Sequence, residues 1–345
     1  MTNINTTLET SRGDLKTDNP PPSQPPELLF FTYANAKYQV FATLYPLFAL
    51  ISNPYAVVEI IISDYELFKK NYANIMEFYD TNYPGKVRYT SVDANPLIAG
   101  KNILPNSMRF IIEPTLKAKY VYIGDIDILL AEDVLNYWLK FMDKHQSDFG
   151  NVVRPNNPDA ITGLHFIPYD KMYPVVIPPD IDLRMNDEML LCRFMREKKL
   201  RFPVNASLWD RRVHGVHISY FSRPPLDSKT TFDRCNEYFP AWGREYAEKY
   251  LDIRYSKPVI KFIECIRTRQ IELRRIIQFT DMWAFFCREH PGNAIYDRNA
   301  APDKVVSSKQ EQPTKVLSKP KKNLDFLLNW DYHTACDRQD ILSRF

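Results

Sequence analysis

The first part of the chain alternates between short strand-like runs and stretches of apolar residues with helical spacing. The strand-like runs cover residues 28–32, 57–62, 86–90 and 120–124, and the helically spaced stretches cover 38–51, 66–79 and 107–116. Runs of this length are typical of buried strands, and apolar residues three or four apart are typical of helices. Strands that alternate with helices form a largely parallel sheet that is covered on both faces. The pattern therefore predicts an α/β fold.

The pattern is less regular after residue 124. Residues 148–154, 161–168 and 213–220 resemble strands, and they lie around a predicted helix from Asn186 to Lys198. Pro178 and Pro179 do not fit inside a helix, so we expect the helix to start after them with Asn186 as its N-cap. The strand-like runs would complete a mixed sheet, and Asp187 would lie in the first turn of the helix.

The C-terminal third has apolar residues at helical spacing from 259 to 280, interspersed with lysines and arginines. This predicts a basic amphipathic helix, which either packs on the domain or contacts an anionic membrane. The predicted organisation is a disordered Pro-rich leader (1–26), a core domain (27–250), a basic helical extension (251–300), a Lys-rich linker (301–323) and a C-terminal segment (324–345).

Composition narrows the class of protein. A chain of 345 residues with 45% hydrophobic content buries a large core. Its net charge of +3 does not indicate nucleic-acid binding, and its five cysteines lack the spacing of a zinc site or a disulfide framework. The chain has no apolar run of about 18 residues that would span a membrane, and residues 1–26 lack the apolar core of a signal peptide. We therefore expect a cytoplasmic protein.

Candidate chemistry begins at the end of the fourth predicted strand, where Asp125 and Asp127 follow an apolar run. Open α/β sheets bind ligands at the carboxyl ends of their strands. Carboxylates there commonly share Mg²⁺ or Mn²⁺ with the phosphates of a substrate, which points to a nucleotide diphosphate. The same spacing at Asp180 and Asp182 follows two prolines instead of a strand. The alternative for Asp125 and Asp127 is simple turn formation.

Residues 28–224 resemble the retaining nucleotide-sugar glycosyltransferases of family eight, the glycogenin and lipopolysaccharide galactosyltransferase type, which have the GT-A fold. Arg109 precedes the Asp-x-Asp motif at the family's distance, although it could instead pair with Glu113 on one helix. His217 is followed six residues later by Arg223 and then by Pro224. In the family this His is the third metal ligand and a Lys-Pro pair follows. The resemblance thus implies His217 as a ligand and Arg223 as the diphosphate contact.

The loop after the first predicted strand is similar to the family's base-binding loop. The resemblance implies nucleotide contacts from Thr32, Tyr33, Asn35, Tyr38 and Asp64. Asn35 stands where the family has Asp, Tyr38 would stack on the base, and Asp64 would hydrogen-bond to it.

The stretch of the family that contacts the donor sugar corresponds to residues 161–163 here, with Gly163 at its end and a departure from the family's residues before it. The identity of the donor sugar therefore stays open.

Asp187 and Glu188 are the candidate catalytic residues. In a retaining enzyme Asp187 would stabilise the cationic sugar. Inverting GT-A enzymes instead carry an acidic pair at the start of a comparable helix, and one carboxylate of the pair deprotonates the acceptor hydroxyl. In this chain Asp187 would be that base. The spacing from His217 to Pro224 favours retention.

The combined expectation is a GT-A glycosyltransferase that moves a hexose from a UDP-sugar to a glycan or lipid-linked acceptor, with Mn²⁺ or Mg²⁺ bound. A cation and a basic side chain neutralise the charge that develops on the departing diphosphate. Two other classes stay open. A phosphatase with an aspartyl nucleophile is disfavoured by Leu129 and by the motif's place on the fourth strand. A catalytically inactive GT-A-like binding module is the other.

Overall fold

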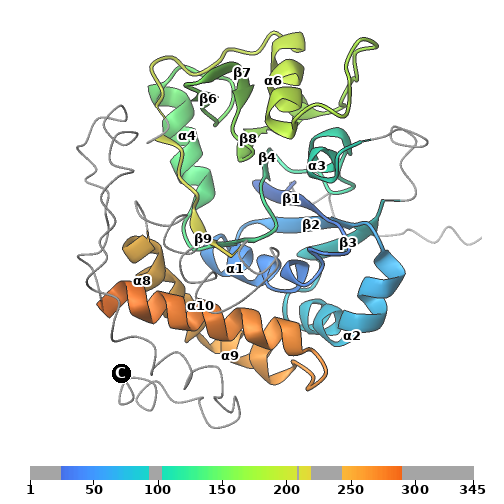
Figure 1. The fold of residues 1–345 in the computed structure, drawn as a ribbon, viewed down its shortest axis with the longest axis vertical. Coiled ribbons are helices and arrows are strands. Elements are labelled where there is room, and N and C mark those ends of the chain that lie inside the picture. The colour runs from blue at the N-terminus through green and yellow to red at the C-terminus, as the bar shows by residue number, and fades with distance from the viewer. Residues whose placement is uncertain (1–24, 93–102, 208–209, 219–242, 290–345) are drawn as a thin grey trace, which may run out of the picture.

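A five-stranded mixed sheet forms the centre of the protein in a computed structural model, which describes residues 25–92, 103–207, 210–218 and 243–289 (Figure 1). The strands are β1 (Leu28–Ala34), β2 (Val57–Ile62), β3 (Val87–Ser91), β4 (Tyr120–Ile123) and β8 (His165–Pro168), in the order β3-β2-β1-β4-β8. The first four are parallel, and β8 is antiparallel to β4. Helices flank the sheet, so the predicted fold class is confirmed.

The strand sequences explain why helices cover both faces. Alternate residues of β1 enter two separate apolar clusters: Leu28 and Phe30 belong to one, and Leu29 and Phe31 to the other. Continuous apolar strands of this kind are typical of parallel sheets with two buried faces. The helices before residue 200 are α1 (Tyr45–Ser52), α2 (Tyr65–Asn82), α3 (Met108–Ile111), α4 (Val134–Lys144), α5 (Tyr169–Met172) and α6 (Asp187–Glu197), with 3₁₀ turns at Phe41–Thr43 and Pro105–Ser107.

Two short antiparallel ribbons extend the fold beyond the central sheet. One pairs β5 (Ile128–Leu130) with β9 (Gly215–His217), and the other pairs β6 (Val153–Arg154) with β7 (Asn157–Ile161). Within the first ribbon, a Cβ on Gly215 would lie 1.9 Å from the carbonyl oxygen of Leu129. Only glycine allows the two strands to approach this closely.

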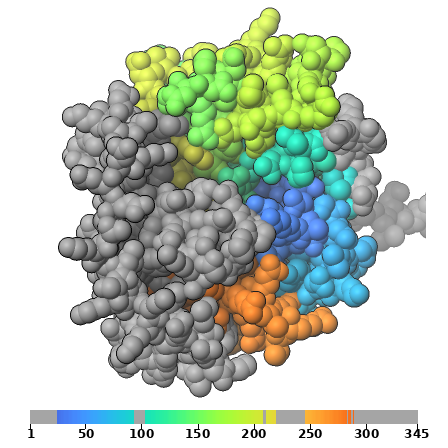
Figure 2. Space-filling view, in the orientation of Figure 1, coloured from blue at the N-terminus to red at the C-terminus, as the bar shows by residue number. Residues whose placement is uncertain are grey.

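Helices α8 (Gly243–Arg254), α9 (Lys257–Glu264) and α10 (Ile271–Glu289) form the C-terminal part of the described chain and lie beside α1 and α2 (Figure 1). The rings of Phe48 and Tyr250 stack at 5.5 Å, and those of Phe78 and Phe262 meet edge to face at 5.2 Å. In the space-filling view these orange helices adjoin the blue N-terminal half, with the green segments on its opposite side (Figure 2). The extension is therefore packed on the sheet domain.

The structure divides the predicted helix 259–280 into α9 and α10. Two side-chain hydrogen bonds connect the segment between α9 and α10 to α2: Asn74 donates to the carbonyl of Cys265, and Gln270 donates to the carbonyl of Asn71. Val259, Phe262, Leu273, Ile276 and Ile277 are all buried, which favours the packing interpretation over membrane contact. No helix in the described ranges combines the length and apolar character needed to cross a bilayer.

Other predicted elements differ in length. The predicted helix 38–51 starts with a 3₁₀ turn and becomes α-helical only at Tyr45, and the predicted helix 107–116 is α-helical only as far as Ile111. The helix ends at the extended residue Ile112, and Pro114 disfavours the helical conformation of Glu113, the residue before it, so the helix does not continue as predicted. Helix α4 was absent from the prediction.

Candidate functional site

The three residues predicted as metal ligands lie together beyond the carboxyl end of β4. Asp125 and Asp127 follow this strand, and His217 is the last residue of β9. Each offers a ligand atom within 4.8 Å of the others, and His217 Nε2 lies 3.3 Å from Asp127 Oδ1. The ribbon enforces this arrangement, because Ile128 pairs with His217 and the N–H of Ile218 donates to the Asp127 carbonyl at 2.7 Å.

The donor set fits a divalent cation. Neighbouring ligands around an octahedral Mg²⁺ or Mn²⁺ are about 3 Å apart, which the His217–Asp127 separation approaches. Two carboxylates with one imidazole combine the oxygen ligands preferred by Mg²⁺ and Mn²⁺ with a nitrogen ligand that Mn²⁺ also accepts. Burial alone would lower the pKa of His217, but Asp127 and Asp125 raise it above its usual value. The site therefore attracts positive charge.

Arg109, on α3, connects the metal-ligand cluster to the start of α6. Its buried guanidinium donates through Nη1 to Asp125 and to the Gly124 carbonyl, and through Nη2 to Asp187 at 3.2 Å. Burial would raise the pKa of Asp125, but Arg109 and His217 hold it below its usual value. Arg109 thus pairs with Asp125 and Asp187, not with Glu113 as the alternative interpretation had it.

Gly163 leaves room for this arginine. A Cβ at this position would lie 2.9 Å from Arg109 Nη2 and 4.0 Å from both Asp125 Oδ1 and Asp187 Oδ2. The end of the segment predicted to contact the donor sugar therefore lies against the two carboxylates that Arg109 joins.

The two predicted catalytic carboxylates occupy different environments. The side chain of Asn186 caps α6 by accepting from the N–H of Glu188, as predicted. Glu188 receives two hydrogen bonds from Arg154 of β6, one of them from Nε at 2.7 Å. Burial raises the pKa of Asp187, with Arg109 opposing this and Asp125 adding to it. Asp187 thus faces the metal-ligand cluster, and Glu188 belongs to a separate ion pair.

The predicted nucleotide-binding residues lie around the carboxyl ends of β1 and β2. Thr32 is fully buried, and its hydroxyl donates to the Gly124 carbonyl at 2.8 Å, so it supports the end of β4 from inside the fold. Asn35 accepts from the backbone of residues 37 and 38, and Asp64 caps α2 by accepting from Leu67. Tyr33 and Tyr38 are half-buried. Arg223, the predicted diphosphate contact, lies outside the described residues.

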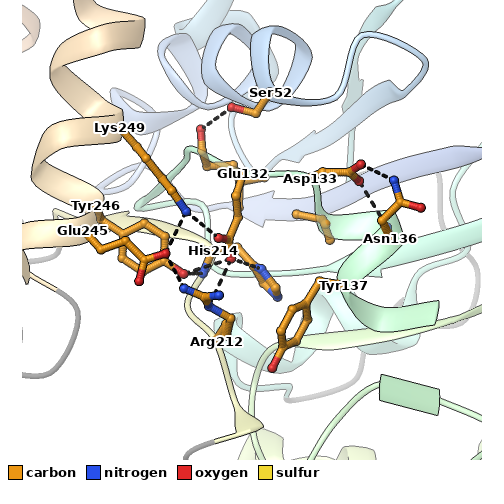
Figure 3. A network of polar contacts seen from close by, with 12 residues as sticks. Ser52, Glu132, Asp133, Asn136, Tyr137, Arg212, His214, Glu245, Tyr246 and Lys249 are labelled. Atoms are coloured by element: carbon orange, nitrogen blue, oxygen red, sulfur yellow. Dashed lines mark hydrogen bonds and ion pairs between the residues drawn. The ribbon is translucent and has the colours of Figure 1, made fainter. Parts of the chain in front are cut away.

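A second polar network anchors the β5–β9 ribbon to α8 (Figure 3). Glu132, just after β5, accepts from His214 at 2.7 Å, from Tyr246 at 2.9 Å and from Lys249 at 2.9 Å, with Arg212 at 3.5 Å. His214 is fully buried with a positive φ of 63°, and it contacts different groups from His217. This network stabilises the ribbon that positions His217.

Sequence reasoning missed two arginines of the site, Arg154 and Arg211. Arg154 ends a strand-like run, and Arg211 lies in an arginine pair just before β9. Nothing local distinguishes Arg211 from Arg212, although Arg212 contacts Glu132 and Glu245, and Arg211 interacts electrostatically with Asp125 and Glu188. Only the fold separates their roles.

The described residues thus define an α/β protein with a candidate acidic metal site beyond the carboxyl end of β4. No protein-family model matches this chain, and no curated protein matches its sequence. Solved structures of similar fold include an active-site mutant of LgtC (16% identity, TM-score 0.31, 50% of this chain and 64% of that one). Another is the galactosyltransferase LgtC with donor and acceptor sugar analogues (14% identity, TM-score 0.31, 50% and 65% coverage). A third is S. aureus TarS 1–349 (13% identity, TM-score 0.35, 79% and 93% coverage). This chain spans about 64% of the length of LgtC, and likenesses this distant concern the fold alone.

Proposed function

We propose that this protein is a metal-dependent glycosyltransferase that moves a hexose from a UDP-sugar to a glycan or glycolipid acceptor. The observation that carries the proposal is the convergence of Asp125, Asp127 and His217 within 4.8 Å of one another, with Arg109 joining this cluster to Asp187. Ligand sites at the carboxyl ends of parallel strands suit a nucleotide, and the donor set suits Mn²⁺ or Mg²⁺.

Each residue has a distinct role in the proposed reaction. Asp125, Asp127 and His217 hold the cation, which when bound neutralises the charge that develops on the departing UDP. Tyr33, Asn35, Tyr38 and Asp64 bind the nucleoside at the ends of β1 and β2.

Asp187 stabilises the positive charge on the sugar carbon as the glycosidic bond to UDP breaks. Arg109 orients Asp187 through the hydrogen bond at 3.2 Å.

Retention of configuration is the favoured outcome. Asp187 and Glu188 are each held by an arginine, and this arrangement suits carboxylates that act as fixed charges. An inverting enzyme would instead use Asp187 to remove the acceptor proton, and its raised pKa is compatible with that role. Proton NMR of the first product formed from a UDP-α-sugar separates the two, because retention gives the α-anomer.

Titration calorimetry of UDP, with and without Mn²⁺, tests the proposed donor site. We expect metal-dependent UDP binding that is lost in the double variant Asp125→Ala plus Asp127→Ala. The matched control is Asp180→Ala plus Asp182→Ala, which removes the same spacing from an exposed loop where both carboxylates pair with surface arginines. Absence of UDP binding in the wild-type protein, or equal loss in the control, would contradict the proposal. Binding without turnover of any UDP-sugar would identify an inactive binding module.

A further inference from the structure

Arg211 is a half-buried arginine without a hydrogen-bonded partner among the described residues of the candidate site. It lies six residues before His217, in the segment that leads into β9. Its Nε is buried without a hydrogen-bond partner, and its guanidinium makes no hydrogen bond or ion pair within the described ranges. Arg109 and Arg154, the other arginines of the site, each bind carboxylates directly.

The charged groups around Arg211 are those of the candidate site. It interacts electrostatically with Asp125, Glu188, Tyr122 and Arg154, and its charge also acts on His217. The hydroxyl of Tyr122 is likewise buried without a partner. Leaving the buried Nε of a charged guanidinium without an acceptor is unfavourable, and a guanidinium stays charged at neutral pH. An anionic ligand at this position would supply the missing acceptor.

The charges of the site indicate the class of ligand. Asp125, Asp127, Asp187 and Glu188 carry four negative charges against the three positive charges of Arg109, Arg154 and Arg211. A divalent cation reverses this balance and leaves a net positive site. Since Arg109 and Arg154 are already engaged, Arg211 is the described cation that is available to an added anion.

We propose that Arg211 donates hydrogen bonds from its guanidinium to the diphosphate of the nucleotide-sugar, beside the metal-ligand cluster. The planar guanidinium presents paired N–H groups that match phosphate oxygens, which makes arginine well suited to this contact. This inference rests on the proposed function, and it assigns the diphosphate contact to a described residue of the chain. Arg211 would then stabilise the negative charge that develops on the departing UDP.

Binding of UDP and uridine in the presence of Mn²⁺ tests the assignment on wild-type protein and on Arg211→Gln and Arg211→Lys. We expect Arg211→Gln to bind UDP about tenfold to a hundredfold more weakly, the loss of a charged hydrogen bond, while uridine affinity is unchanged. Arg211→Lys should lose less UDP affinity than Arg211→Gln, because the lysine ammonium keeps a positive charge at this position. Arg184→Gln is the matched control, because Arg184 is exposed and pairs with Asp182.

The outcomes separate this inference from the proposed function. If the wild-type protein does not bind UDP, both fail. If the wild-type protein binds UDP and Arg211→Gln binds it equally well, or if uridine binding falls in parallel, the assignment of Arg211 alone is overturned. Thermal unfolding of the ligand-free variants supplies a second readout. We expect the unfolding temperature of Arg211→Gln to be no lower than that of the wild type. If Arg211→Gln unfolds at a lower temperature and Arg211→Lys unfolds at the wild-type temperature, Arg211 has a structural role instead.

Discussion

Replacing Glu132 by Gln should remove the central charge of the network that ties the β5–β9 ribbon to α8. The Glu132 side chain is 12% exposed and accepts from His214, Tyr246 and Lys249. Burial opposes its ionisation, but His214 and Lys249 together lower its pKa from 4.5 to about 2. At 1.36 kcal/mol per pH unit, this difference corresponds to roughly 3 kcal/mol of stability near pH 7.

The effect should depend on pH in a defined direction. A carboxylate whose pKa is lowered by folding contributes its full stability above the unfolded pKa, here near 4.5. The contribution falls as the pH decreases through the window from 4.5 to about 2. We therefore expect Glu132→Gln to lose roughly 3 kcal/mol at pH 7 and much less near pH 2.5.

Urea unfolding followed by tryptophan fluorescence measures this loss, because Trp138 packs edge-on to His214 at 5.3 Å and reports on the network. Glu197→Gln is the control, since Glu197 forms an exposed pair with Arg193 that should contribute at most about 0.5 kcal/mol. A loss below about 1 kcal/mol for Glu132→Gln, or a loss that is the same at both pH values, would refute this reasoning.

Three further substitutions test the local geometry. Gly215→Ala should prevent β5 and β9 from pairing, because its Cβ would lie 1.9 Å from the Leu129 carbonyl oxygen, and thermal unfolding followed by circular dichroism should show strong destabilisation. Gly85→Ala is the control: its Cβ meets no neighbour, so its positive φ should lower the free energy of unfolding by only about 1 kcal/mol. Asn186→Ala should lower the free energy of unfolding by about 1 kcal/mol in urea, because it removes the N-cap of α6. Gly163→Ala should displace Arg109 and weaken Mn²⁺-dependent UDP binding in calorimetry without preventing folding.

Features with a local signal could be predicted from the sequence. The strand Val57–Ile62 follows from one apolar run, and Asn186 follows from the capping preference after two prolines. The end of β4 could be predicted because an apolar run stops at two carboxylates. The helix predicted over 107–116 is shorter in the structure, because the apolar spacing continues past Ile111 and takes no account of Pro114.

Partners that are distant in the sequence could not be predicted. Arg109 lies 78 residues before Asp187, and Glu132 lies 114 residues before Tyr246. A residue type indicates that a charge needs a partner, but only the topology determines which charge comes near it. For this reason the break between α9 and α10 was also missed, since α2 supplies its hydrogen bonds across the fold.

The pairing of charges has a consequence for how cation and nucleotide would bind. Asp125 gives one carboxylate oxygen to Arg109, so the protein offers a cation the ligand atoms that remain on Asp125, Asp127 and His217. A hard divalent cation held by so few protein groups completes its shell with water or substrate phosphate. In the proposed assignment Arg211 would bind the same phosphate. The cation and the nucleotide would then strengthen each other's binding, and by linkage each would raise the affinity of the other by the same factor.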